Sequence, residues 1–410
     1  MAGPAAARQA NPVEYNLLLT ATLCLLAFGA VMVYSASSAE SLLSGEGDGS
    51  AFLVQYLVKG ALGVVALLVV ARRPLAWALR MTPPLLAASF AMLLAVKVPG
   101  VGLEINGARR WLGVGPITFQ PSEVAKLAIV LYGASVLARR PGRWTHPRQI
   151  TPLLLVAGTT VLLIASQPDL GTALVVSFTC AALLVAAGFP VRWLGLMAGG
   201  GAVLVLLYGF SAEYRRARLM TFLDPWGHAG DAGFQAVQGQ IALGSGGLLG
   251  RGLGQSVQKV FYLPEAHTDF ILAIVGEELG VVGIVAALFL YGLLAYAGLR
   301  VARGARGAYA KLLAAGITSL ILSQALLNVF VVLGLAPLTG VPLPFISYGS
   351  TNVVVLLAGM GLLLNVARGG HVVARAVPAG SRRDGELRDR GGRDGGPRRA
   401  GAGGRRRAAG

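Results

Sequence analysis

The chain has 410 residues, of which 55% are hydrophobic and only 13% are charged. A soluble globular domain carries about 25% charged residues, so this composition excludes an ordinary water-soluble protein. The formal net charge of +17 would suit a nucleic-acid-binding protein, but much of the excess lies in short connections between apolar segments and in the C-terminal tail. That distribution is typical of membrane topology and of contact with anionic lipid, and it argues against nucleic acid as a partner.

Apolar runs near the length that crosses a bilayer, about 20 residues in a helix, recur along most of the chain. We therefore predict an all-α polytopic membrane protein with about ten transmembrane helices. The expected spans are residues 16–36, 53–71, 82–98, 122–138, 151–166, 171–189, 193–210, 268–299, 308–335 and 351–367. They define a membrane domain over residues 16–368, preceded by a short N-terminus, residues 1–15, and followed by a tail, residues 369–410.

Arginine and lysine indicate the expected cytoplasmic side, because short cytoplasmic loops are rich in these residues. The connections 72–81, 139–150 and 300–311 contain several bases and no acid, whereas residues 37–52 contain acids and no base. This pattern predicts that both termini are cytoplasmic. The connections then expected outside are residues 97–121, 167–171, 211–266 and 336–350.

The longest connection, residues 211–266, contains a Gly-rich run at 241–254. A loop of this length in a compact protein is usually functional or disordered, and its leucine and isoleucine content favours a partly ordered amphipathic piece on the membrane. The tail is rich in Arg, Gly, Asp and Pro, a composition that buries too little apolar surface to fold alone. We expect a disordered cytoplasmic tail that contacts anionic lipid or a partner protein.

Residues 261–280, FYLPEAHTDFILAIVGEELG, hold the densest group of candidate functional side chains. An ionisable run that includes His267 and Asp269 leads into an apolar helix that carries Glu277 and Glu278. A carboxylate near the centre of a membrane costs about 2.5–3.5 kcal/mol on insertion scales, so its presence indicates a functional site. The cluster predicts chemistry or transport at a membrane face.

Structural roles for the same residues remain open. Asp269 lies near the expected helix start, where a carboxylate stabilises the helix dipole, and Thr268 could cap that helix. At least one of the two glutamates is expected to pair with an intramembrane cation such as Lys126 or Lys59. His267 could bind a metal or carry a proton, although the lack of a second histidine nearby in the sequence gives little support to a zinc site.

Arg109, Arg110 and Trp111 form a second candidate group in the connection 97–121. Paired arginines beside a tryptophan suit a phosphate and a flat sugar face. Glu123 and Lys126 follow three residues apart, so they share a helix face and can pair inside the membrane. The alternative interpretation is an interfacial Arg/Trp belt with a structural ion pair.

Two further connections are polar or irregular. Asp169 lies in SQPDLG between two apolar runs, where an aspartate more often forms a turn or a helix cap than a site. Residues 337–350, PLTGVPLPFISYGS, contain three prolines and two glycines and cannot form a continuous helix. Irregular backbone at membrane depth occurs only where it is buried in protein or lines a cavity. We therefore predict a re-entrant segment that lines a site, with Ser347 as a candidate substrate-binding residue.

These segments together resemble the SEDS family of bacterial cell-wall proteins (shape, elongation, division and sporulation). The matching motifs, in chain order from about residue 32 to residue 352, are MVYSAS, NGARRW, FQPSEVAKL, QPDLGTA, FLDPW, ALGSGG, YLPEAHTDFI, GEELG and PLTGVPLPFISYG. MVYSAS, FLDPW and the Gln-Lys pair before YLPEAHTDFI resemble the FtsW-like division branch more than the RodA-like elongation branch. SYGST at 347–351 and QGQ at 238–240 depart from the usual runs of the family.

The resemblance implies a peptidoglycan glycosyltransferase that polymerises lipid II at the outer face of the bacterial cytoplasmic membrane during cell division. It implies a class B penicillin-binding protein and other divisome proteins as partners. It also implies that Asp269 is the essential acidic residue and Trp111 a second functional position. The main alternatives are a flippase or transporter of lipid II and a non-catalytic scaffold of the division machinery.

A mechanism consistent with these residues places Asp269 as general base on the attacking sugar 4-hydroxyl. Arg109 and Arg110 would stabilise the departing diphosphate. Mg²⁺ or Mn²⁺ is a candidate cofactor, since hard cations bridge phosphate and carboxylate oxygens, and no organic cofactor is expected. The other candidate substrate-binding residues are Trp111, Glu123, Lys126, Asp169, His267 and Ser347.

Overall fold

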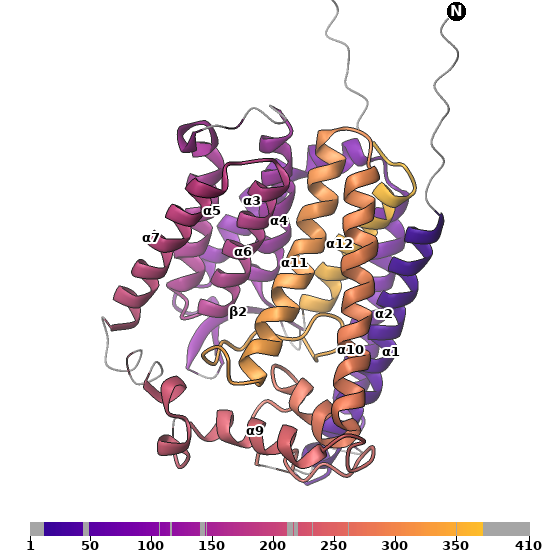
Figure 1. Ribbon diagram of the computed structural model, residues 1–410, viewed down its shortest axis with the longest axis vertical. Coiled ribbons are helices and arrows are strands. Elements are labelled where there is room, and N and C mark those ends of the chain that lie inside the picture. The colour runs from indigo at the N-terminus through magenta and orange to yellow at the C-terminus, as the bar shows by residue number, and fades with distance from the viewer. Residues whose placement is uncertain are drawn as a thin grey trace, which may run out of the picture. The chain divides into compact units, whose positions relative to one another are not determined.

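The computed structural model describes residues 12–43, 49–105, 107–114, 117–139, 144, 146–210, 216, 220–231, 233–260, 262–349 and 351–371. Within them, each predicted span overlaps one helix (Figure 1). These helices are α1 (Pro12–Leu43), α2 (Ala51–Arg72), α3 (Leu75–Ala95), α4 (Pro121–Leu137), α5 (Thr151–Ala165), α6 (Leu170–Ala186), α7 (Val191–Phe210), α10 (Ile271–Gly304), α11 (Ala308–Val332) and α12 (Asn352–Ala367). The predictions for residues 1–11 and for the tail beyond residue 371 lie outside the described residues.

Length and hydropathy confirm the predicted class of protein. In the described part of the chain, 6 helical stretches are long and apolar enough to cross a membrane, and α6 and α12 are shorter apolar helices. Many of their large apolar side chains are exposed, including Leu62 on α2, Leu162 on α5 and Phe289 on α10. An apolar exterior of this kind is the surface that lipid covers. The chain is therefore a polytopic helical membrane protein.

A small sheet departs from the all-α expectation. The connection predicted at 97–121 contains three antiparallel strands, β1 (Gly102–Ile105), β2 (Ala108–Val114) and β3 (Ile117–Phe119), in the order β1-β2-β3. Ile105 pairs with Ala108, so only two residues join β1 to β2. Those residues are Asn106-Gly107, the strongest short-range sequence signal for a hairpin, and Gly107 has the positive φ of 71° that such a turn requires.

Helix α3 begins earlier than expected. The prediction started this span at residue 82. The helix instead begins at Leu75 and contains both prolines in its interior. Prolines are tolerated inside membrane helices where hydroxyl side chains and neighbouring helices satisfy the freed backbone groups. The Thr82 hydroxyl donates to the Ala78 carbonyl at 2.9 Å, just before the two prolines.

Helix α10, predicted as one span over residues 268–299, is broken at Gly280. This residue has φ 65° and ψ −160°, outside the helical range. Residues 271–279 therefore form a short helical segment that is separate from residues 281–304. A left-handed φ of this kind favours glycine, because a side chain would clash with the backbone.

The segment 247–252 bridges the break in α10 through its backbone. The carbonyls of Glu277 and Glu278 accept hydrogen bonds from the N–H groups of this segment at 2.9 and 3.0 Å. In return, the N–H groups of Val281 and Val282 donate to its carbonyls at 3.0 and 3.3 Å. The polar groups that the break would leave unpaired are therefore satisfied inside the protein, as membrane depth requires.

Helix α9 (Phe234–Gly246), which lies in the long connection 211–266, packs closely against the start of α10. The connection thus contains the partly ordered piece that was predicted, here as a helix, while its position on the membrane stays a prediction. A Cβ on Gly246 would lie 1.9 Å from the Gly276 carbonyl oxygen, and one on Gly239 would lie 2.5 Å from a ring carbon of Phe270. Only glycine allows the two backbones to approach this closely.

Replacing Gly246 with alanine should lower the free energy of unfolding by about 1–3 kcal/mol, because the added methyl meets rigid backbone. Gly244 lies on the same helix with nothing within 4 Å of its Cβ position, so Gly244→Ala should be neutral or stabilising by up to about 1 kcal/mol. Thermal unfolding of the purified protein in detergent compares the two variants. Equal midpoints for both would contradict the close packing.

Candidate functional site

Three of the predicted outer connections are linked by contacts that lead to Asp269, just before α10. These are the sheet, residues 166–169 between α5 and α6, and the proline loop, which we define as residues 336–349. Figure 1 shows β2 and α9 toward the same, lower end of the helices. The start of α6 touches the proline loop, since a Cβ on Gly171 would lie 2.7 Å from the Thr339 carbonyl oxygen.

Asp269 is half-buried in the turn that precedes α10, one residue before the N-cap residue Phe270. Its backbone carbonyl accepts a hydrogen bond from Asn328 Nδ2 at 2.7 Å. Its Oδ2 atom lies 3.7 Å from the position that a Cβ on Gly340 would take. The carboxylate therefore faces the proline loop at a position where the loop has no side chain.

The predicted N-cap at Thr268 is wrong. The hydroxyl of Thr268 lies 2.8 Å from Glu265 Oε2 and 3.2 Å from Asp269 Oδ1, and α10 begins after Phe270 without a side-chain cap. The turn over residues 264–270 delays the helix start, so Thr268 is too far upstream to reach the first free N–H groups. It instead orders the turn that carries Asp269.

The proline loop is irregular, as predicted, and most of residues 341–347 are buried in protein. Phe345 is fully buried and has a positive φ of 65°. Four side chains from α2, α10 and α11 donate hydrogen bonds to its carbonyls: Asn328 to Val341, Gln324 to Pro342, Tyr291 to Pro344 and Tyr56 to Phe345. Polar helix side chains thus replace the secondary-structure partners that the loop lacks.

Glu123 and Lys126 form the predicted ion pair, with Nζ 2.8 Å from Oε2 and both side chains almost fully buried. Asn352 Nδ2 donates to the same Glu123 oxygen at 2.7 Å, and Lys126 Nζ donates to Gln324 Oε1 at 2.7 Å. Gln324 Nε2 in turn donates to the Pro342 carbonyl at 2.9 Å. The ion pair is therefore connected through one amide to the proline loop.

The sequence analysis assigned no role to Gln324 and Asn328, although their spacing in the helix indicates one. They lie four residues apart in an otherwise apolar helix, so they project from one face. Both amides contact the proline loop, and Asn328 also contacts Asp269. Polar residues at helical spacing inside a span indicate a common polar partner.

The two arginines of β2 make different contacts. Arg109 is exposed and pairs with Glu104 at 3.1 Å. Arg110, on the opposite face of the strand, donates from Nε and Nη2 to the carbonyls of Gln167 and Pro168 at 3.0 and 2.6 Å. Arg110 therefore fixes the 166–169 connection, whereas Arg109 remains exposed and could receive an anion. Trp111 is half-buried on the same strand.

Asp169 is buried and caps α6, with Oδ1 accepting from the Thr172 N–H at 3.0 Å. Its other oxygen accepts from Gln120 Nε2 at 3.3 Å. The capping interpretation is confirmed, and the carboxylate also links α6 to the end of the sheet. Ser347 is likewise buried, and its hydroxyl oxygen accepts from the Leu343 N–H at 2.8 Å, which orders the proline loop itself.

His267 is buried among rings. Its ring lies 4.5 Å from that of Phe52 and 5.7 Å from that of Tyr348, centre to centre. Lys59 donates to the Tyr348 hydroxyl at 3.0 Å and lies 4.5 Å from the centre of its ring. Burial raises the pKa of the Tyr348 phenol above its ordinary value, so the phenol remains neutral at physiological pH and accepts this bond. His267 and Lys59 thus belong to the α2 side of the site.

The expectation that at least one of Glu277 and Glu278 pairs with a buried cation is confirmed, but the two candidate partners, Lys126 and Lys59, are wrong. Glu278 pairs with Lys259 at 2.8 Å, and Glu277 lies 3.6 Å from Arg251. Both cations come from the connection that precedes α10. The backbone of that connection enters the break at Gly280, which the sequence did not reveal, and so places its own cations beside the two carboxylates.

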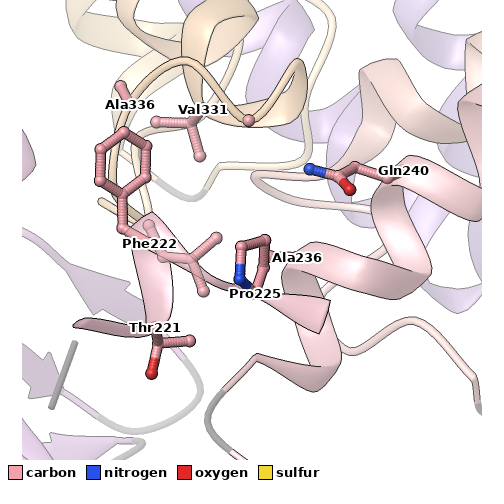
Figure 2. Close-up of a pocket in the computed structure, with 9 residues that line it drawn as sticks. Thr221, Phe222, Pro225, Ala236, Gln240, Val331 and Ala336 are labelled. Carbon is pink, nitrogen blue, oxygen red and sulfur yellow. The ribbon is translucent and has the colours of Figure 1, made fainter. Parts of the chain in front are cut away.

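A pocket lies between α9, the end of α11, the first residues of the proline loop and the segment around Thr221 and Pro225 (Figure 2). It is mostly apolar, and it contains none of the predicted site residues. Its lining residues are Thr221, Phe222, Pro225, Ala236, Gln240, Val331, Gly334, Ala336 and Leu338. Among the described residues, no group of three or more His, Cys, Asp or Glu side chains is placed to hold a metal ion.

The geometry defines a multi-pass membrane protein with a polar site at one end of its helices. The FtsW/RodA/SpoVE family model, a cell cycle protein family, matches residues 15–371. The chain therefore belongs to this family, which is the SEDS family that the motifs indicated.

Comparisons with individual relatives support this family assignment. Stage V sporulation protein E of Bacillus subtilis (strain 168) is 41% identical over 357 residues, covering 86% of this chain and 96% of the relative. A probable peptidoglycan glycosyltransferase FtsW of Geobacter sp. (strain M18) is 38% identical, with 86% and 96% covered. Among solved structures, a chain from work on polymerization and crosslinking by a peptidoglycan synthase complex has a TM-score of 0.70 at 30% identity, with 86% and 97% covered. Rod shape determining protein RodA of Thermus thermophilus has a TM-score of 0.64 at 30% identity, with 87% and 97% covered.

Replacing Lys126 with methionine should destabilise the protein by about 3–5 kcal/mol, because Glu123 is left buried without its cation. The double variant Glu123→Gln/Lys126→Met removes both charges and should recover most of that loss. Chemical denaturation in detergent measures both.

The matched control is Arg109→Gln, which breaks a half-exposed pair and should change stability by less than about 1 kcal/mol. If Lys126→Met proved as stable as Arg109→Gln, Glu123 would not be buried as a carboxylate.

Proposed function

We propose that this protein is a peptidoglycan glycosyltransferase that polymerises lipid II into glycan strands at the outer face of the bacterial cytoplasmic membrane. Family membership over residues 15–371 supports the reaction class, since the FtsW relatives are named probable peptidoglycan glycosyltransferases. The observation that carries the proposal is the position of Asp269, a half-buried carboxylate where α10, α11 and the proline loop meet.

In this mechanism Asp269 accepts the proton of the acceptor sugar 4-hydroxyl as that oxygen attacks the anomeric carbon of the donor. A new glycosidic bond forms, the bond from the anomeric carbon to the diphosphate oxygen breaks, and the lipid diphosphate leaves. Asn328 supports the geometry, because it bonds both to the Asp269 carbonyl and to the proline loop. The base is thereby held in a fixed position relative to the loop.

Charge on the leaving group requires a cation. Arg109 is the better candidate of the two arginines, because Arg110 already donates to two backbone carbonyls. Trp111 would place its ring against a sugar. Glu123, Lys126, Asp169 and Ser347 act by holding the loops that surround the substrate, since their polar groups bond to protein, and His267 does so through its ring contacts.

Mg²⁺ or Mn²⁺ fits this site only if the substrate phosphates supply ligands together with the protein. The described residues do not supply three clustered ligands of their own, but Mg²⁺ is commonly bound by one or two carboxylates together with substrate phosphates and water. Asp269 would provide the protein ligand, and the ion would supply positive charge to the diphosphate.

Topology and partners belong to the same proposal. The distribution of arginine and lysine supports cytoplasmic termini and an outer site. The relation to a chain of a peptidoglycan synthase complex supports a crosslinking class B penicillin-binding protein as partner. Identities of 38–41% to an FtsW relative and to the sporulation protein support a role in division or sporulation.

Asp269→Asn should reduce lipid II polymerisation by at least about 100-fold, because the amide keeps the shape of the carboxylate but cannot accept the proton. The assay uses purified protein in detergent with its penicillin-binding partner and Mg²⁺ or Mn²⁺. Asp231→Asn, which neutralises an exposed acid of the preceding connection, should keep the wild-type rate.

Detergent removes the two sides of a membrane, so a flippase would make no product in this assay. No glycan from folded wild-type protein under any metal condition would favour the transporter or scaffold alternative. Glycan at the wild-type rate from Asp269→Asn would reject the base assignment alone.

A further inference from the structure

A second buried charge cluster lies at the break in α10, away from Glu123 and Lys126. Glu278 is fully buried, and its Oε1 atom lies 2.8 Å from Lys259 Nζ. The hydroxyl of Ser35 lies 2.8 and 2.6 Å from the two Glu278 oxygens and 3.3 Å from Lys259 Nζ. Each of the three side chains therefore contacts the other two, and we name this cluster the latch.

The latch joins three parts of the chain. Ser35 comes from α1, Lys259 from the connection after α9, and Glu278 from the short helical segment 271–279. Ser35 and Glu278 are 243 residues apart in sequence. Helices α1 and α10 pack against each other along their lengths (Figure 1), so the latch ties the start of α10 to a long neighbouring helix.

Glu277 is held differently. It accepts hydrogen bonds from the Ser256 hydroxyl and from the Val257 and Gln258 N–H groups, the latter two at 3.0 and 3.4 Å. Its only cation within the described part of the chain is Arg251, whose side chain is exposed and lies 3.6 Å away. The two adjacent buried glutamates thus offer one buried and one exposed cation for direct comparison.

Asp269 lies midway between the latch residues in the chain. Lys259 precedes it by ten residues and Glu278 follows it by nine, so the ion pair closes a loop that has Asp269 at its centre. Residues 271–279 extend about 13.5 Å as a helix, with Asp269 before one end and Glu278 near the other. A rotation of this segment would therefore move Asp269.

The break at Gly280 makes such anchoring necessary. In a continuous helix, residues 281–304 would fix the orientation of residues 271–279. Here Gly280 interrupts the helix, so the short segment depends on α9, the bridging segment 247–252 and the latch.

We propose that Lys259 is a positioning residue for catalysis: together with Glu278 and Ser35 it fixes the segment 271–279 and thereby places Asp269 against Gly340 of the proline loop. This inference rests on the proposed function, because it takes Asp269 as the base. Lys259 does not contact the substrate in this role. Its effect should appear in the rate of the chemical step and not in the affinity for lipid II.

Lys259→Met should lower kcat for lipid II polymerisation by about 10- to 100-fold with little change in KM, because misplacing a catalytic group by about 1 Å can reduce the rate about 100-fold. The charge-reversed pair Lys259→Glu/Glu278→Lys should restore most of the rate. Arg251→Gln, which removes the exposed cation of Glu277, should keep the wild-type kcat.

Ser35→Ala provides a variant that keeps the ion pair and therefore folds even if Lys259→Met does not. It should reduce kcat by a smaller factor than Lys259→Met, with an unchanged thermal midpoint. Hydrogen exchange of residues 262–270 gives a readout that does not require activity, and it should speed up in both variants but not in Arg251→Gln.

Wild-type kcat in both Lys259→Met and Ser35→Ala would overturn the proposal. So would a loss of activity that only follows the folded fraction, or one that Arg251→Gln reproduces. The proposed function fails separately, through full activity of Asp269→Asn, while faster exchange of residues 262–270 in the latch variants would still support the structural part of the inference.

Discussion

Irregular backbone inside a membrane protein must find its hydrogen-bond partners within the protein, and much of this structure depends on that constraint. The proline loop meets it with side chains, because Tyr56, Tyr291, Gln324 and Asn328 all donate to its carbonyls. The break in α10 meets it with backbone, through the segment 247–252. Polar residues in the apolar helices are thus explained by the irregular segments that they support.

The buried ion pairs are also connected to the irregular segments. Desolvation offsets much of the attraction between two buried charges, so such pairs are weak evidence for stability. In the described part of the chain, the two pairs with both side chains buried instead connect an irregular segment to a long helix. Glu123 and Lys126 reach the proline loop through Gln324, and Glu278 and Lys259 reach α1 through Ser35. Each pair thus joins a segment next to Asp269 to the surrounding helices.

The spans were predictable because ten apolar runs have a physical length that the bilayer sets. The Glu123–Lys126 pair was predictable because a spacing of three places both residues on one helix face. The partners of Glu277 and Glu278 were not, since they depend on a backbone segment entering α10 at Gly280, and a lone glycine in an apolar run gives no such indication. The sheet was missed for another reason: the Asn106-Gly107 hairpin signal was present, but it was interpreted only through its neighbouring arginines.

The candidate site, too, was predictable from the sequence only in part. Motif resemblance located Asp269, Trp111 and the arginines, but it could not separate side chains exposed to a ligand from side chains used by the fold. Asp169 caps a helix, Ser347 orders its own loop, and Arg110 bonds to carbonyls. Such distinctions require three-dimensional partners, because each of these residue types serves both purposes equally well in sequence.

The sequence separation within the latch has a consequence for biogenesis. A chain is synthesised from its N-terminus, so Lys259 is made only 19 residues before Glu278, whereas Ser35 is made 243 residues before it. The carboxylate therefore has its counter-ion in the connection that immediately precedes its helix, and the ion pair need not wait for the rest of the protein to assemble. The contact with α1 can form only later, once the helices gather, which makes insertion of α10 and its docking two separable steps.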